Sequence, residues 1–256
     1  MITSRGNSAV RGVIALIKKP KERELKDAFV IEGIRMYREV PEEMLREVYI
    51  SDRFYKKHPS FRPPAGVRFE VVADDVFETM SDTKTPQGII AVAGRYHWTK
   101  EDLMSQDPLI VALENLQDPG NLGTIFRSAE AAGATGILMD AATCDVYNPK
   151  VIRATMGAVF RLPFVIADDL GQALSEYRQQ GIAVYAAHLK GSVPYTKPSY
   201  KEGSILLIGN EGNGLSDEIA EIADERIRIP MKGKAESLNA SVAASVLLFE
   251  AMRQRG

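Results

Sequence analysis

A series of short apolar segments in the C-terminal part of the chain constrains the fold more than any other feature. Each segment has the length of a β-strand, and stretches with helical patterns separate them. Their residues are apolar throughout rather than at every second position, which is typical of parallel strands buried on both faces by helices. The sequence therefore predicts an α/β fold with a mainly parallel sheet. The expected strands are Leu109–Leu113, Gly136–Met139, Phe164–Ile166, Ile182–Ala187, Ile205–Ile208 and Arg226–Ile229.

The N-terminal third alternates shorter helical and strand patterns and predicts a second, smaller α/β unit. A stretch at 58–66 contains three prolines and is expected to be a loop. Residues 94–108 are polar and show no sustained apolar pattern, so the domain boundary should lie there. We predict an N-terminal domain at 1–94, a linker at 95–107 and a C-terminal domain at 108–256. The N-terminal domain should contain strands at 29–31, 48–50, 69–72 and 88–93, and helices at 34–40 and 74–80.

The bulk composition excludes several classes of protein. With 256 residues, 45% of them hydrophobic, the chain can bury a core without covalent cross-links. The single cysteine, Cys144, excludes an intramolecular disulfide, and the three histidines lack metal-ligand spacing, so we expect no metal site. No apolar run approaches the length of a membrane span, and the first residues lack a signal-peptide core. We therefore expect a cytoplasmic protein without a membrane partner.

Basic residues are concentrated near the N-terminus, although the formal net charge of the chain is −2. Residues 1–100 contain 18 Lys and Arg against 14 Asp and Glu, and the first 26 residues contain seven against two. Such a basic patch is suited to contact phosphate groups, whereas a solvated helix face would give the same pattern. The candidate phosphate contacts are Arg5, Arg11, Lys18, Lys19, Lys21 and Arg23.

The first segment with chemical content is 115–133, which follows the strand at 109–113. Its Asp-Pro-Gly sequence at 118–120 predicts a turn, with a helix that begins close to Asn121. Asn121 is placed either to cap this helix or to hold a ligand. Arg127 lies off the apolar stripe, where it could act on a ligand or form a surface ion pair. The apolar stripe consists of Leu122, Ile125, Phe126 and Ala129, spaced to face the core.

The second segment, 205–218, leads from a buried strand into a glycine-rich loop. Gly209, Gly212 and Gly214 would let backbone N–H groups approach a ligand at the carboxyl edge of the sheet. The spacing differs from the dinucleotide fingerprint, and the loop lacks the lysine of a phosphate-binding loop. Glu211 would repel a phosphate and suits a cationic or hydroxyl-bearing ligand. A tight turn without a ligand is the alternative.

The third segment, 227–250, leads from a strand through a polar loop into a long terminal helix, which Ser237 or Asn239 can cap. Apolar residues occupy more than one face of this helix. The helix is therefore expected to be buried on two sides, either at a subunit interface or within its own monomer. One face carries Leu238, Val242, Val246 and Phe249, and the second carries Ala243, Leu247 and Leu248.

Together these three segments resemble the signature motifs of the SpoU/TrmH family of RNA 2′-O-ribose methyltransferases, part of the SPOUT superfamily. The N-terminal domain resembles the family's substrate-binding domain, which has an L30e-like fold; residues 2–7, 21–23 and 29–33 carry that likeness. In the three motifs the matching residues are Asn121, Gly123 and Arg127; Gly209, Glu211 and Gly214; and Ile229, Pro230, Ser237, Leu238, Asn239 and Ala243.

The resemblance implies a C-terminal domain with a deep trefoil knot, a homodimer with each active site near the dimer interface, and S-adenosylmethionine as the cofactor. It assigns Arg127 to the reaction centre, where a guanidinium would stabilise the developing alkoxide and bind the adjacent phosphate. Asn121, Ser237 and Asn239 would orient Arg127 and the ribose, and Glu211 would hold the motif loops or offset the arginine charge. The implied cofactor residues are Gly209, Ile229 and Leu238, with Leu189, Ile208, Gly212 and Met231 as further candidates.

The target of the reaction follows from family analogy alone. The two-domain organisation favours 23S ribosomal RNA, which the basic N-terminal residues would bind. The alternatives are a transfer-RNA 2′-O-methyltransferase and an RNA-binding ribosome-assembly factor without catalysis. A nucleotide-dependent oxidoreductase is disfavoured, because the chain lacks an early dinucleotide fingerprint and its acidic ribose partner.

Overall fold

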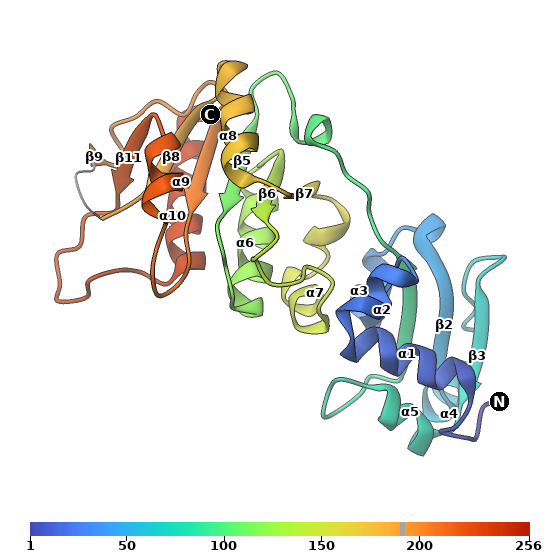
Figure 1. Ribbon diagram of the computed structural model, residues 1–256. Coiled ribbons are helices and arrows are strands. Elements are labelled where there is room, and N and C mark those ends of the chain that lie inside the picture. Colours follow the sequence, from blue (N-terminus) through green and yellow to red (C-terminus); the bar gives the residue numbers. More distant parts are fainter. Residues whose placement is uncertain (190–192) are drawn as a thin grey trace. The chain divides into compact units, whose positions relative to one another are not determined.

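The structure is a computed structural model that describes residues 1–189 and 193–256. The chain forms two compact units (Figure 1). Unit 1 consists of Met1–His97 together with Asp145–Phe160, and unit 2 consists of Trp98–Cys144 together with Arg161–Gly256. Unit 1 thus takes in a segment that lies far along the chain from the rest of it.

Unit 1 contains a four-stranded sheet in the order β1-β4-β2-β3. β4 pairs antiparallel with β1 and β2, and β2 pairs parallel with β3. The four strands coincide with the predicted ones to within a few residues. Their bounds are Ala28–Glu32 for β1, Leu45–Ser51 for β2, Arg68–Val72 for β3 and Ile89–Gly94 for β4.

Helices cover both faces of this sheet. α1 and α5 share one apolar core with it, which includes Val10 of α1, Phe77 of α5 and Tyr49 of β2. α3 packs against β1 and β4, and α4 packs against β2 and β3. Unit 1 is therefore a three-layer α/β/α unit. Its remaining elements before residue 97 are α1 (Ser8–Lys18), α2 (Pro20–Leu25), α3 (Ile34–Glu39), η1 (Glu42–Met44), α4 (Asp52–Lys57) and α5 (Asp74–Met80).

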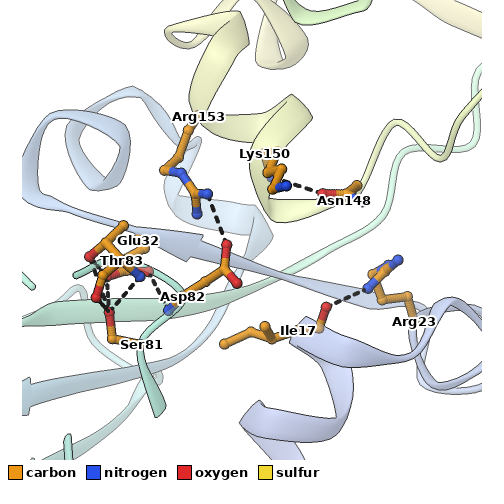
Figure 2. A network of polar contacts seen from close by, with 9 residues as sticks. All are labelled: Ile17, Arg23, Glu32, Ser81, Asp82, Thr83, Asn148, Lys150 and Arg153. Carbon is orange, nitrogen blue, oxygen red and sulfur yellow. Dashed lines mark hydrogen bonds and ion pairs between the residues drawn. The ribbon is translucent and has the colours of Figure 1, made fainter. Parts of the chain in front are cut away.

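The segment 145–160 contributes α7 (Pro149–Thr155) and the short helix η3 (Ala158–Phe160) to unit 1. α7 packs against β1. The ring centroids of Phe29 and Tyr147 are 4.7 Å apart, and Val151 and Val159 are fully buried. The segment therefore completes the core of unit 1. Polar contacts in the same region join it to the loop after α5 (Figure 2).

Unit 2 contains a seven-stranded sheet in the order β7-β6-β5-β10-β8-β11-β9. Every pairing between these strands is parallel. All five residues of the central strand β10 are buried, as its continuous apolar run predicted. The predicted α/β fold is thus confirmed. The strands are β5 (Leu109–Leu113), β6 (Gly136–Asp140), β7 (Phe164–Ala167), β8 (Ala183–Ala187), β9 (Val193–Pro194), β10 (Ser204–Ile208) and β11 (Glu225–Arg228).

Two helix pairs pack on the sheet of unit 2. Alternate strand residues such as Ile110 and Leu207 share a core with α8 and α9. The intervening residues Val111 and Leu206 are equally buried and point the opposite way, and α10 packs against β10 and α6. No helix of the described residues is long and apolar enough to cross a lipid bilayer. The helices are η2 (Lys100–Leu103), α6 (Pro119–Ala131), α8 (Leu170–Gln179), α9 (Asp217–Ile222) and α10 (Ala240–Arg255).

The helix α6 begins earlier than its sequence predicts. Pro119 is its first residue, and the side chain of Asp118 caps it by accepting a hydrogen bond from the Asn121 N–H at 2.8 Å. A proline fits the first helical turn because its missing N–H has no partner to lose there. Asn121 therefore lies inside the first turn. Because Asp118 caps the helix, the side chain of Asn121 is available for other hydrogen bonds.

Candidate active site

A cavity of about 390 Å³ opens at the carboxyl ends of β8, β10 and β11. The strands lead directly into its walls, since His188 follows β8, Gly209 follows β10 and Ile229 follows β11. This edge is where α/β sheets bind ligands. The remaining wall comes from the start of α10 and from the loop before it, including Ser237 and Leu238.

The loop 209–214 closes on itself next to the cavity. Asn210 and Gly214 exchange two backbone hydrogen bonds of 3.0 Å. A side chain at Gly209 could not be accommodated, because its Cβ would lie 2.3 Å from the carbonyl carbon of Gly214. The backbone of Gly214 has a positive φ of 70°, which favours glycine. The glycines therefore serve turn geometry and, at the same time, leave this wall of the cavity without side chains.

Glu211 joins this loop to the start of α6. One carboxylate oxygen accepts hydrogen bonds from the Asp118 N–H at 2.9 Å and from Asn121 Nδ2 at 3.0 Å, and the other accepts from the Gln117 N–H at 3.1 Å. Burial would raise the pKa of Glu211, but these hydrogen bonds hold the pKa below its ordinary value. A carboxylate at the N-terminus of a helix is also favoured by the helix dipole.

Asn121 continues this connection to α10. Its Oδ1 accepts hydrogen bonds from Asn239 Nδ2 at 2.9 Å and from Ser241 Oγ at 3.3 Å. Asn239 caps α10, since its own Oδ1 accepts from the N–H groups of Ser241 and Val242. A continuous path of side-chain hydrogen bonds, Glu211–Asn121–Asn239, thus links the three sequence motifs. Of the two predicted caps of α10, Asn239 takes this role, whereas Ser237 lines the cavity.

The structure brings the seven predicted cofactor residues together around the cavity. Three are the positions that match the family motifs, Gly209, Ile229 and Leu238, and the other four are Leu189, Ile208, Gly212 and Met231. Sequence reasoning missed several further lining residues, among them Ala187, Ile227 and Asp217. Ala187 and Ile227 could have been found from their place at the ends of predicted strands.

The predicted catalytic residues occupy three kinds of position relative to the cavity. Glu211 and Ser237 line the cavity, whereas Asn121 and Asn239 support it through hydrogen bonds. Arg127 is exposed on α6 and is not part of the cavity wall. The next residue, Ser128, shares a hydrogen bond of 2.7 Å with Ser245, which fixes this part of α6 against α10.

Five of the six predicted phosphate contacts are exposed in unit 1. The prediction is wrong for the sixth, Arg23, which is only 3% exposed. The guanidinium donates to Asp145 Oδ2 through Nε and Nη2, at 2.9 and 2.5 Å, and to the carbonyl of Leu16 at 2.6 Å. Arg23 is thus committed within the core of unit 1 and cannot present a charge to RNA. The exposed residues are Arg5, Arg11, Lys18, Lys19 and Lys21.

The parallel sheet, the cavity at its carboxyl edge and the hydrogen-bonded motif residues define a methyltransferase of the SPOUT class. The chain belongs to the SpoU family. The model of the SpoU rRNA Methylase family matches residues 108–249, and the model of the MRM3-like substrate binding domain matches residues 7–91.

Similar proteins cover from about three quarters to nearly all of the chain. The 23S rRNA (guanosine(2553)-2′-O)-methyltransferase RlmP of Bacillus subtilis is 32% identical over 90% of both chains. The 23S rRNA (uridine(2479)-2′-O)-methyltransferase of Streptomyces viridochromogenes is 34% identical over 74% of this chain and 69% of its own. Among solved structures, the AdoMet-bound rRNA methyltransferase of Sinorhizobium meliloti has a TM-score of 0.87 at 33% identity, covering 98% of this chain and 97% of its own.

Proposed function

We propose that this protein transfers a methyl group from S-adenosylmethionine to a ribose 2′-hydroxyl of 23S ribosomal RNA. The observation that supports this most strongly is the Glu211–Asn121–Asn239 connection, because it joins all three family motifs beside one cavity. The similar proteins from Bacillus subtilis and Streptomyces viridochromogenes are named as 23S ribosomal RNA 2′-O-methyltransferases.

The cavity has the chemistry that S-adenosylmethionine requires. Ile229, Leu238 and Met231 offer apolar contacts for an adenine ring, and Gly209 lets backbone groups approach the ligand. Glu211 places a carboxylate at the wall, which suits a cationic sulfonium better than a phosphate. The cofactor would supply a methyl group on a positively charged sulfur, already a good electrophile.

The protein's own contribution is then to align the ribose oxygen and to stabilise its negative charge. A guanidinium remains protonated in proteins, so Arg127 would stabilise the alkoxide and bind a neighbouring phosphate rather than remove the proton. Ser237 and Asn239 would orient the ribose through hydrogen bonds. Asn121 would hold Asn239 and Glu211 in place, as its hydrogen bonds indicate.

Ribosomal RNA is a better-supported substrate than transfer RNA. A solved structure that concerns 2-OH methylation of C/U34 on tRNA covers only 59% of this chain, with a TM-score of 0.54. The AdoMet-bound rRNA methyltransferase of Sinorhizobium meliloti covers 98%. We assign RNA binding to the exposed basic residues Arg5, Arg11, Lys18, Lys19 and Lys21 of unit 1. These contacts should weaken as salt concentration rises.

We also propose that the protein forms a homodimer through α10. Val242, Phe249 and Met252 of this helix are 47, 44 and 38% exposed, which is unusual for large apolar side chains gathered on one helix. A second copy of the same chain would bury them and complete the two-sided burial that the sequence predicts. The trefoil knot stays a prediction from the family resemblance, and the cytoplasmic location stays a prediction from the sequence pattern.

The function is tested by methyl transfer in vitro. The full-length protein is incubated with methyl-labelled S-adenosylmethionine and either unmodified 23S ribosomal RNA or transfer RNA, and the modified ribose is mapped. Label in 23S RNA at a 2′-oxygen supports the proposal, whereas label in transfer RNA alone overturns the substrate assignment. Tight cofactor binding by calorimetry distinguishes an enzyme from a non-catalytic assembly factor, which would show neither binding nor transfer.

A further inference from the structure

Unit 1 has a second basic surface besides its N-terminal residues. It consists of α4 and the first part of the loop that follows, residues 53–62, and is called the α4 surface below. Residues 52–62 contain four Lys and Arg against one Asp, and they also contain Phe54, Tyr55, His58 and Phe61. Basic side chains next to aromatic rings suit single-stranded nucleic acid, because phosphates pair with the charges while bases stack on the rings.

The α4 surface lies on the face of the unit 1 sheet opposite to α1. Val72 of β3 belongs to the core beneath α1 and α5, so Phe69, three residues earlier in the strand, points to the other face. Phe61 contacts Phe69 there, with 6.2 Å between the ring centroids. The loop that leads from α4 to the edge strand β3 can be followed in Figure 1. The surface is therefore separate from the basic residues of α1.

Phe61 holds this loop against three elements of unit 1. Besides Phe69 of β3, its ring contacts Tyr37 of α3 and Phe54 of α4, each with 5.5 Å between the centroids. Prolines at positions 59, 63 and 64 restrict the backbone further. The loop is thus held in one arrangement before a ligand binds, which lowers the entropic cost of binding.

The same loop places the guanidinium of Arg62 over the ring of Tyr55. Nη1 of Arg62 donates to the carbonyl of Pro59 at 2.9 Å and to that of Phe61 at 2.6 Å. Its Cζ lies 5.9 Å from the centroid of the Tyr55 ring. Tyr55 is only partly buried, and Arg62 is exposed. Two flat groups of the kind on which bases stack are therefore presented together to solvent.

The positive charge of the α4 surface is only partly neutralised. Asp52, the single acidic residue of 52–62, pairs with Lys56 at 2.6 Å. Within residues 1–189 and 193–256, Lys57 and Arg62 form no ion pair with an acidic side chain, and both are exposed. Their charges are therefore available to phosphate groups.

We infer that the α4 surface is a second RNA-binding site, at which an unpaired base stacks on Tyr55 and Arg62 while Lys57 contacts a phosphate. This rests on the proposed function and adds to it a preference for single-stranded over duplex RNA. In a duplex the bases are already stacked on one another, so their faces cannot reach a protein ring. An acidic protein segment would meet the same charges but offers no base to stack, so the aromatic side chains favour RNA.

The test measures RNA binding by the full-length protein, using fluorescence anisotropy at several salt concentrations. The probe is a short labelled single-stranded RNA of mixed sequence. The competitors are the same RNA annealed to its complement, and poly-glutamate. The variants are Tyr55→Ala, Tyr55→Phe, Arg62→Ala and Lys57→Ala, with Lys201→Ala as the charge control because Lys201 is exposed in unit 2. Melting temperatures check that each variant is folded.

Tyr55→Ala and Arg62→Ala should each weaken binding of the single strand about fivefold or more, the effect of losing a stacked base. Tyr55→Phe keeps the ring and should bind as the wild type does, and so should Lys201→Ala. Lys57→Ala should reduce the slope of log K against log salt by about 0.7, since it removes one phosphate contact. Duplex RNA and poly-glutamate should compete only weakly with the probe.

The inference is overturned by a wild type that does not bind the single strand, or by unchanged binding in the alanine variants at 55, 57 and 62. Equal competition by duplex RNA or by poly-glutamate also overturns it. None of these results contradicts the proposed function if the wild type methylates 23S ribosomal RNA. Conversely, a wild type that binds the probe as expected but transfers no methyl group contradicts the proposed function and supports the α4 surface.

Discussion

At the scale of single residues, Glu211 has two roles, and both require the same ionisation state. It faces the cavity, and it holds the start of α6 through the N–H groups of Gln117 and Asp118. Both tasks require the ionised carboxylate. Its pKa is lowered in the folded protein because those donors favour the charged form over the opposing effect of burial. The site therefore depends on the charge of Glu211 as well as on its shape.

Glu211→Gln should destabilise the protein at pH 7 by about 1 kcal/mol, because the amide can accept fewer of these hydrogen bonds and the site is partly open to solvent. A lowered folded-state pKa gives stability that is present above the unfolded pKa and lost as pH falls through the folded one. The difference between wild type and variant should therefore shrink below about pH 4. Urea unfolding at pH 7 and pH 3.5 measures this; a difference that grows in acid contradicts it.

A substitution at Arg127 should separate cofactor binding from the methyl-transfer step. This residue is exposed on α6 and does not line the cavity, so that Arg127→Ala should leave the Kd for S-adenosylmethionine within about twofold. The kcat should fall about 10²- to 10³-fold, as for other residues that stabilise a developing negative charge. Single-turnover methyl transfer and calorimetry check the two parts. Near-wild-type rates in both Arg127→Ala and Arg127→Lys would remove this residue from the mechanism.

The sequence alone predicted a substantial part of the cavity wall, because the residues at strand ends and in glycine-rich loops have distinctive local patterns. It was wrong about the exposure of Arg23, and it left the role of Asn121 open. A run of basic residues does not reveal which guanidinium turns inward to Asp145, and an asparagine near a helix start looks like a cap until Asp118 is seen to occupy that position. The outcome at Arg23 depends on a partner that is distant in the chain, whereas the cap of α6 was a choice between two residues of the same turn.

At the scale of elements, α10 shows why a helix can be apolar on two faces. One side packs in the monomer, where Ala244, Leu247 and Leu248 are buried. The other exposes Val242 and Phe249. The sequence predicted two apolar faces but left open whether both were covered within the monomer. The structure shows that the monomer covers only one, and the proposed dimer would cover the second.

Phe249→Glu should separate a dimer into monomers. A charge placed at 249 would be solvated in the monomer, where the side chain is already 44% exposed, but buried without a partner in the interface. Analytical ultracentrifugation should show the loss of dimer with an unchanged far-UV spectrum. Arg253→Ala is the control, since Arg253 lies on the same helix with its side chain 67% exposed. A monomeric wild type would contradict the proposed interface.

The two sheets were predictable to a greater degree than the helices around them. Strands such as β5 and β10 have continuous apolar runs whose ends are marked by polar residues, and their observed bounds follow these runs closely. α7 has no such signal: seven residues with a proline at the start make a helix too short for a clear period. Its existence depends on packing against β1, which local patterns do not encode.

At the scale of the whole molecule, the order of the chain and the compact units do not coincide. The family model for the methylase matches 108–249 without interruption, and the sequence likewise predicts one continuous domain from 108 onward. The structure assigns 145–160 to unit 1. Apolar patterns show that Val151 and Phe160 are buried, but they cannot show against which partner, because hydrophobic burial is non-directional.

This arrangement predicts that the N-terminal domain is incomplete when cut at its sequence boundary. A fragment of residues 1–97 would expose the apolar surface around Phe29 that Tyr147 and Phe160 cover. Each large apolar side chain buried by the segment contributes about 1.5–3 kcal/mol. Joining residues 145–160 to this fragment by a flexible Gly/Ser linker should therefore raise its free energy of unfolding by at least about 3 kcal/mol. The linked segment should also abolish binding of an apolar dye.

The control is Val151→Asp in the joined fragment. It should cancel the gain in unfolding free energy, since an aspartate there is buried without a partner. Urea midpoints that are equal with and without the segment would show that unit 1 folds independently of it.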